Sequence, residues 1–195
     1  MRSARGVALV DVLAAASLSV IVAGIAVPTI GGALDRERTV VGAQHLAGQL
    51  QRARLESLKR GTPVALRLAV VDDGRTEMRL FVDRNGNGVA ERDIDRGLDL
   101  PLGAAAWLDQ HARDVSLRIN QVVDDISGTG QLAPGDDPLR IGSSALVTFS
   151  PLGGATSGTM YVSARRGPQM AVRVFGATGR IRVLTFDARA RQWRP

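Results

Sequence analysis

The sequence predicts an α+β fold in which one long amino-terminal helix packs on an antiparallel β domain of about seven strands. Three observations support this prediction. An apolar stretch of helical length comes first, a helical hydrophobic period follows it to residue 60, and short runs of alternating hydrophobicity separated by turn residues fill the rest. A long helix laid on small antiparallel sheets is an α+β arrangement. The length of 195 residues allows one such domain with an appendage.

The first element is the apolar stretch of residues 7–34, whose only charged residue is Asp11. From Val7 to Pro28 a helix would rise about 33 Å, against a bilayer hydrocarbon core of about 30 Å. The stretch exceeds the apolar region of a secretory signal but fits a membrane anchor that keeps Arg2 and Arg5 in the cytoplasm. A plain anchor leaves Asp11 unexplained, because a carboxylate inside a membrane helix costs about 2.5–3.5 kcal/mol.

The second element is an amphipathic helix over residues 35–60. We expect Pro28 and Gly31-Gly32 to bend or loosen the chain before it, and Asp35 to act as its cap or first-turn acid. Gly61 and Pro63 predict where it ends. One apolar stripe should face a core, formed by Val40, Ala43, Leu46, Ala47 and Leu50.

The remaining elements are short strands divided by glycine-rich turns. In Met170-Ala171-Val172-Arg173-Val174 and in Arg180-Ile181-Arg182-Val183, the arginines alternate with aliphatic residues, which is typical of strands buried on one face. The predicted strands cover residues 64–71, 76–82, 115–122, 145–149, 159–164, 170–175 and 180–186. The segment 101–114, which contains Trp107, has no clear assignment.

The composition excludes several classes of chemistry. Apolar residues make up 45% of the chain, so a packed core is expected, and the absence of cysteine excludes disulfides, thiolate metal sites and cysteine nucleophiles. His45 and His111 lie in no recognisable nucleophile, metal or phosphate-loop motif, and we interpret both as ordinary surface or interface residues. We therefore expect no enzymatic activity and no cofactor.

Positive charge is concentrated near the carboxyl end. Residues 151–195 contain eight arginines and one acid, Asp187, a net charge of +7 within a chain total of +6. This balance favours an acidic partner such as phosphate backbones or anionic lipid head groups, although an arginine-biased coding composition would give part of the same pattern.

A partial calcium motif is present in Asp83-Arg84-Asn85-Gly86-Asn87-Gly88. Alternating oxygen side chains and a glycine match the first half of a calcium loop, but the twelfth position is Ile94 instead of a bidentate Glu. A turn built from Asn and Gly explains the same residues without a metal. Asp83, Asn85 and Asn87 are thus a weak calcium candidate, and no metal is expected.

The amino terminus, Gly6-Val7-Ala8-Leu9-Val10-Asp11-Val12-Leu13, resembles the prepilin leader of type IV pilins and type II secretion pseudopilins. The resemblance implies that a prepilin peptidase cuts between Gly6 and Val7 and methylates the new amine of Val7. Asp11 then stands fifth after the cut and would pair with the amine of a neighbouring subunit during filament assembly, while Pro28 is a proline common in these helices. Val7 replaces the usual Phe, and Asp11 the usual Glu.

The rest of the chain is similar to the GspH/FimT branch of minor pseudopilins and minor pilins. The similarity lies in residues 53–64 (ARLESLKRGTPV), 80–88 (LFVDRNGNG), 149–153 (FSPLG) and 179–182 (GRIR). It implies a pilin-like fold with four parts: a prepilin leader peptide (1–6), a transmembrane helix (7–30), an amphipathic helical spine (31–61) and a periplasmic GspH-like β domain (62–195).

By this resemblance, the chain is a single-pass inner-membrane protein with a cytoplasmic amino terminus and a periplasmic carboxy-terminal domain. Its expected role is that of a minor pseudopilin in the pseudopilus of the type II secretion system, which exports folded proteins across the outer membrane. Its partners would be other pseudopilins or pilins, the prepilin peptidase/methylase and membrane lipid. The alternative is a type IV pilus minor pilin in pilus assembly or DNA uptake, in which Arg180 and Arg182 match a GRxR tail implicated in binding nucleic acid. A solvated strand face would account for the same arginines.

Overall fold

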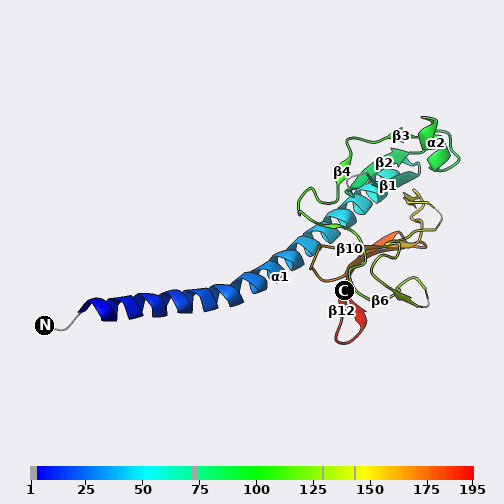
Figure 1. The fold of residues 1–195 in the computed structure, drawn as a ribbon. Coiled ribbons are helices and arrows are strands. Elements are labelled where there is room, and N and C mark those ends of the chain that lie inside the picture. Colours follow the sequence, from blue (N-terminus) through cyan, green and yellow to red (C-terminus); the bar gives the residue numbers. More distant parts are fainter. Residues whose placement is uncertain (1–3, 72–73, 129, 143) are drawn as a thin grey trace. The chain divides into compact units, whose positions relative to one another are not determined.

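The computed structural model describes the backbone of residues 4–71, 74–128, 130–142 and 144–195, and their side chains except those of residues 4–8 and 22–30. The chain divides into two compact units, Met1–Leu34 and Asp35–Pro195. The first unit is the amino-terminal part of helix α1 (Ala4–Arg60). The second holds the rest of α1 together with all the other described elements (Figure 1).

Helix α1 is assigned without interruption from Ala4 to Arg60. The predicted loosening at Pro28 and Gly31-Gly32 therefore does not break it, because a proline withdraws only one backbone donor and glycine costs a helix only about 1 kcal/mol. The expected capping role of Asp35 is wrong, since this residue lies inside the helix. Its carboxylate instead pairs with Arg38 at 3.1 Å, one turn later on the same face.

The sequence predicts a transmembrane helix over residues 7–30. Among the residues that the structure describes, no helix combines the length and the hydropathy that crossing a bilayer requires. The membrane-spanning part of the fold prediction is therefore not supported.

The predicted apolar stripe of the spine faces the core of the second unit. Ala43, Leu46 and Leu50 are fully buried, and Val40 and Ala47 pack against the same cluster. The helix ends as predicted at Gly61, which adopts a positive φ of 65°, with Lys59 and Arg60 in its last turn, where cations favour the helix dipole. Pro63 then leads directly into the first strand.

The described strands form two main antiparallel sheets and one small one. The first sheet has the order β3-β2-β1-β9, with β4 paired to β2; the second has the order β13-β12-β11-β10-β5, with β8 paired to β10; β6 and β7 pair alone. The bounds are β1 Val64–Val70, β2 Thr76–Val82, α2 Glu91–Asp95, β3 Leu100–Pro101, β4 Ala106–Trp107, β5 Ser116–Leu117, β6 Val123–Asp124, β7 Gln131–Leu132, β8 Leu139–Arg140, β9 Leu146–Phe149, β10 Gly158–Ser163, β11 Met170–Phe175, β12 Arg180–Asp187 and β13 Gln192–Arg194.

Six of the seven predicted strands are confirmed as β1, β2, β9, β10, β11 and β12. The prediction over 115–122 is mostly wrong, because only Ser116–Leu117 pairs as β5. Beyond it, side chains replace the ladder: Asn120 donates its backbone N–H to Gln169 Oε1 at 2.9 Å and its amide to the Gly167 carbonyl at 2.7 Å. The other strands are pairs or triplets of residues too short for sequence periodicity to reveal.

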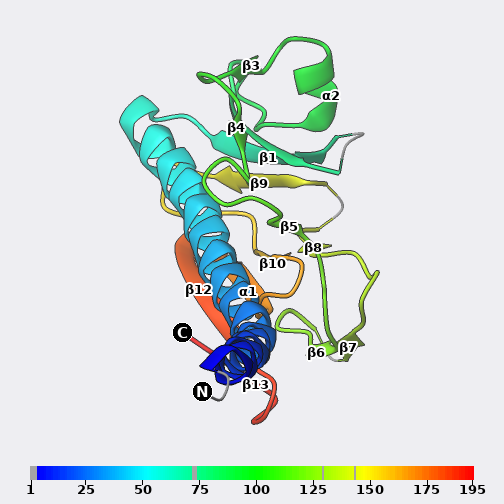
Figure 2. The same cartoon turned by 60° about the vertical axis from the view of Figure 1, so that its left-hand side comes forward.

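Each main sheet buries a face against α1. Figure 2 shows β1 and β9 of the first sheet and β10 and β12 of the second beside the same helix. One core cluster joins the helix to both sheets, including Leu46, Leu66, Phe149 and Val172. A second cluster covers the opposite face of the second sheet, where Tyr161 and Phe186 pack with Trp193 and the β6–β7 segment.

A single hydroxyl joins α1 to the end of β10. Thr39 Oγ1 donates to the Asp35 carbonyl at 2.7 Å and accepts the backbone N–H of Ala164 at 3.0 Å. Thr39 is fully buried, and a Cβ at Gly167 would collide with its hydroxyl. This polar contact therefore fixes the position of the helix along the domain.

Candidate functional site

The predicted processing site lies at the start of α1. The backbone of Gly6 and Val7 belongs to this helix, but their side chains lie outside the described set. Cleavage between them and methylation of Val7 therefore stay predictions. The structure adds only that the residues just after the cut are helical.

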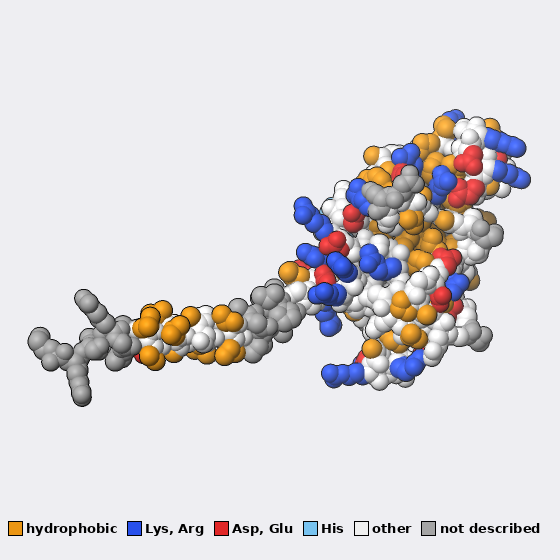
Figure 3. Space-filling model, viewed as in Figure 1, with side chains coloured by type: hydrophobic (Ala, Val, Ile, Leu, Met, Phe, Trp, Pro, Cys, Tyr) orange, Lys and Arg blue, Asp and Glu red, His pale blue; other side chains and the backbone are white. Residues whose placement is uncertain are grey.

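Asp11 is exposed on α1 and surrounded in sequence by exposed aliphatic residues. Seven large aliphatic side chains of the described part of the first unit are 58–72% exposed: Leu9, Val10, Val12, Leu13, Leu18, Val20 and Ile21. Figure 3 shows hydrophobic side chains gathered along this stretch. Contiguous apolar surface of this kind marks a contact with lipid or protein.

The two serines of the same stretch satisfy their own hydroxyls. Ser17 Oγ donates to the Leu13 carbonyl at 2.7 Å, and Ser19 Oγ donates to the Ala15 carbonyl at 2.8 Å. Neither hydroxyl therefore depends on water, and the helix can bury this surface without leaving a serine donor unpaired.

The predicted arginine pair lies at one end of the second sheet. Arg180 and Arg182 are exposed on the same face of β12, while Ile181 and Val183 turn to the core. They line a groove of about 530 Å³ together with Phe175, Thr178 and Arg54. Arg54 comes from α1, and no sequence signal connected it to the other two arginines.

A glycine brings the helix and the hairpin together at this groove. Gly179, in the turn between β11 and β12, has a φ of 59°, and its N–H donates to the Phe175 carbonyl at 2.8 Å. A Cβ at this position would lie 2.9 Å from the Gly153 carbonyl and 3.4 Å from Arg54 Nε. The GRIR motif thus needs its glycine for both backbone conformation and space.

The electrostatics of the groove favour an anion. Arg182 pairs directly across the sheet with Arg173, an arrangement in which like charges repel. Their guanidinium carbons lie 5.9 and 5.1 Å from the centre of the Phe175 ring, which offsets part of that repulsion. Among the described residues, no carboxylate pairs with Arg54, Arg180 or Arg182.

Other arginines of the carboxyl end already have partners. Arg191 pairs with Asp124 at 3.0 Å, and Arg194 pairs with Asp187 at 3.2 Å. Arg173 donates to the Ile126 carbonyl at 3.0 Å. The surplus charge predicted from the sequence is therefore concentrated at the groove instead of spread evenly over the segment.

The weak calcium candidate is a hydrogen-bonded loop. Asp83 Oδ1 accepts the N–H groups of Asn85 and Gly86, and Oδ2 accepts that of Gly88 at 2.8 Å. The Asn85 side chain accepts the N–H of Asn87 at 3.2 Å. These bonds explain the Asp-Asn-Gly pattern without an ion, and within the described ranges no group of three or more His, Cys, Asp or Glu side chains is placed to hold one.

The same loop contains a second buried carboxylate, on Asp93. Asn87 donates its side-chain amide to Asp93 Oδ2 at 2.9 Å, and Asn85 adds a longer bond of 3.5 Å. The Asn87 bond is the main reason that the pKa of Asp93 lies below its usual range.

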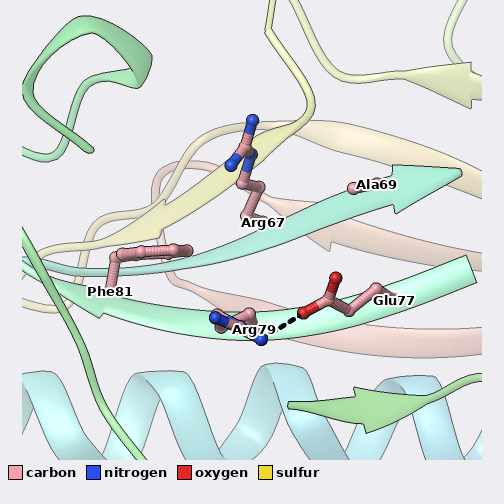
Figure 4. A pocket seen from close by; sticks show the side chains of 5 residues that line it. All are labelled: Arg67, Ala69, Glu77, Arg79 and Phe81. Atoms are coloured by element: carbon pink, nitrogen blue, oxygen red, sulfur yellow. Dashed lines mark ion pairs between the residues drawn. The ribbon is translucent and has the colours of Figure 1, made fainter. Parts of the chain in front are cut away.

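A small pocket on the first sheet contrasts with the arginine groove. Arg67 and Arg79 face each other across β1 and β2 and line a cavity of about 120 Å³ with Glu77 and Phe81 (Figure 4). Here each arginine has a carboxylate: Arg79 pairs with Glu77 at 2.8 Å, and Arg67 with Glu91 at 3.1 Å. The pocket is therefore neutral and offers no net attraction for an anion.

The comparisons with known proteins agree with this architecture. A family model described as Type II transport protein GspH matches residues 42–179, which cover most of the second unit. No curated protein and no solved structure matches the chain. The chain belongs to the GspH family, and its role is that of a pseudopilin-like component of type II transport.

Proposed function

We propose that the chain is a minor pseudopilin of the type II secretion system, a structural subunit of the periplasmic pseudopilus that supports export of folded proteins. The observation that carries this proposal is the exposed aliphatic surface of α1 in a chain whose second unit is a GspH domain. Burying each large aliphatic side chain gains about 1.5–3 kcal/mol. Seven such side chains give the helix a strong tendency to pack against lipid or sister helices.

The inner membrane is the proposed location before assembly. Residues 7–34 carry one charge, and the hydroxyls of Ser17 and Ser19 are bonded within the helix. The amino terminus would be cytoplasmic and the β domain periplasmic, with prepilin peptidase cutting after Gly6 and methylating Val7. Cysteines placed one at a time at Ser3 and Ser150 would report this topology through their labelling by a membrane-impermeant reagent, with only the second labelled in intact spheroplasts.

Asp11 is the proposed assembly residue. Cleavage creates an ammonium group on Val7, and an unpaired carboxylate and ammonium are both costly in an apolar environment, so pairing between subunits offsets both costs. Mass spectrometry of the native protein should find a methylated Val7 as its first residue. A native protein that begins at Met1, or that is cut near residue 30, would rule the proposal out.

Substitution at Asp11 separates processing from assembly. Asp11→Asn removes the charge at nearly constant size, so cleavage should continue while crosslinking into pseudopilin filaments falls. Asp11→Glu is the matched control, because it retains the charge and lengthens the reach by one methylene. Filaments that form equally well with Asn would show that the ion pair is not needed.

The alternative function is a type IV pilus minor pilin that contributes to assembly or DNA uptake. The groove of Arg54, Arg180 and Arg182 favours it, since these guanidinium groups have no carboxylate partner among the described residues. Aromatic residues that stack on single strands are scarce there, so phosphate contacts should dominate. The neighbouring genes would also help to separate secretion from pilus systems.

Mobility shifts of DNA at two salt concentrations test this alternative. Arg180→Ala with Arg182→Ala should weaken binding and lower its salt dependence by about one counterion for each phosphate group that the protein no longer neutralises. Arg165→Ala with Arg166→Ala is the control, because these exposed arginines lie outside the groove. Equal binding by both double variants would exclude the groove as a DNA site.

A further inference from the structure

Two histidines that are far apart in the sequence meet on the surface of the second unit. His45 lies on α1, and His111 lies in the segment between β4 and β5. Their ring centroids are 4.7 Å apart, and the rings are nearly perpendicular at 88°. His45 is half-buried and His111 is exposed, so the pair is accessible to solvent from one side.

Two buried acceptor atoms beside this pair have no hydrogen-bond partner among the described residues. One is His45 Nε2, and the other is the side-chain oxygen of Gln49. Residues 45 and 49 are four apart on one helix and therefore share a face. Buried polar atoms are nearly always paired, so two orphan acceptors on one helix face indicate a missing ligand such as a water or an ion.

The other side of the His45 ring is already held. This imidazole is hydrogen-bonded to the backbone of Trp107, an arrangement that orients metal-binding histidines by leaving the second nitrogen with a free lone pair. Burial, and then the neighbouring His111, lower the pKa of His45. The ring is therefore neutral at physiological pH, which is the form that binds metal ions.

We propose that His45 Nε2 and a ring nitrogen of His111 together bind one divalent late transition metal ion, with Zn²⁺ as the representative. Imidazole nitrogens bind Zn²⁺ at about 2.0–2.1 Å, so the two nitrogens must lie about 3–3.5 Å apart. Rings with centroids 4.7 Å apart reach this separation through rotation of the exposed His111. The Gln49 oxygen is available as a weaker ligand, and water completes the coordination.

The site differs in kind from a structural zinc centre. No group of three or more His, Cys, Asp or Glu side chains in the described part of the chain is placed to hold a metal, so the ion would be exchangeable and bound with modest affinity. It would join α1 to the segment before β5. Because binding to the folded state alone adds stability, metal should raise the melting temperature of the protein.

The test is Zn²⁺ and Cu²⁺ titration of the full chain in neutral detergent, without an affinity tag, by calorimetry and thermal unfolding. The wild type should bind one ion and unfold at a higher temperature with metal present. His111→Ala changes an exposed residue, so it should fold normally, yet bind about tenfold or more weakly because one of two imidazole ligands is removed. Arg113→Ala, an exposed change on the same segment, should behave as the wild type.

Electron paramagnetic resonance of bound Cu²⁺ gives a second readout that does not depend on stability. Two coordinated imidazoles are expected in the wild type, and one in His111→Ala. The absence of saturable binding of one ion by the wild type would overturn the proposal. So would equal affinity of the wild type and His111→Ala for both ions.

Discussion

Gly42 lies where α1 comes closest to the segment before β5. A Cβ built on this residue would overlap Cγ1 of Val115, which is buried in the main core. Val115 is short and β-branched, so it has little freedom to move aside. At Gly48, six residues later on the same helix, nothing lies within 4 Å of the corresponding Cβ.

These two glycines provide a matched pair of predictions. Gly42→Ala should lower the free energy of unfolding by about 1–2 kcal/mol, because overpacking outweighs the gain in helix propensity. Gly48→Ala should raise it by up to about 1 kcal/mol, since only the propensity changes. Denaturant unfolding of both variants measures the difference, and a stabilising Gly42→Ala would show that the helix does not approach Val115 this closely.

Asp93 makes stability depend on acidity. Its pKa is lowered in the folded state, chiefly by the Asn87 amide, so its contribution is present above the unfolded pKa and is lost as the pH falls through the folded pKa. Asn87→Ala should therefore destabilise the protein at neutral pH, and the difference from wild type should shrink at about pH 3. Unfolding curves at the two pH values test this, and a pH-independent difference would contradict it.

At the scale of elements, the buried stripe of α1 should account for much of the stability. Leu50 is fully buried between the sheets, whereas Leu55 on the same helix is 59% exposed. Leu50→Ala should cost about 2–5 kcal/mol of unfolding free energy, while Leu55→Ala should change it by about 0.5 kcal/mol or less. Equal losses in the two variants would mean that the helix packs through a different face.

The elements that the sequence predicted well are those with a local signal. The spine stripe, the helix end at Gly61 and the alternation of β11 and β12 follow from spacing alone. The segment 101–114 carries no such signal because long-range contacts hold it. Arg75 binds Asp109 with two nitrogens and stacks 4.3 Å from the centre of the Trp107 ring.

The candidate sites divide in the same way. The exposure of Arg180 and Arg182 on one strand face was predictable from their alternation with Ile181 and Val183. The addition of Arg54 to their groove and the meeting of His45 with His111 depend on how the helix lies on the domain. No spacing in the sequence reports that arrangement.

At the scale of the whole molecule, both core clusters lie in the second unit. Their described members all come after residue 39, so nothing in the core draws on the first unit. A protein that begins at Asp35 should therefore fold, with a melting temperature within a few degrees of the full chain, while failing to enter filaments. Circular dichroism and sedimentation test this, and loss of cooperative unfolding would show that the first unit is needed for the fold.

The hydrogen bond between Thr39 and Ala164 has a mechanical consequence. A subunit moved by its amino-terminal helix experiences force along the axis of α1. The buried hydroxyl of Thr39 passes that load into β10 through the Ala164 N–H, so the strand and the helix are displaced as one body. Thr39→Val would remove this latch at nearly constant volume, and the domain should then slip along its own helix under a smaller pulling force.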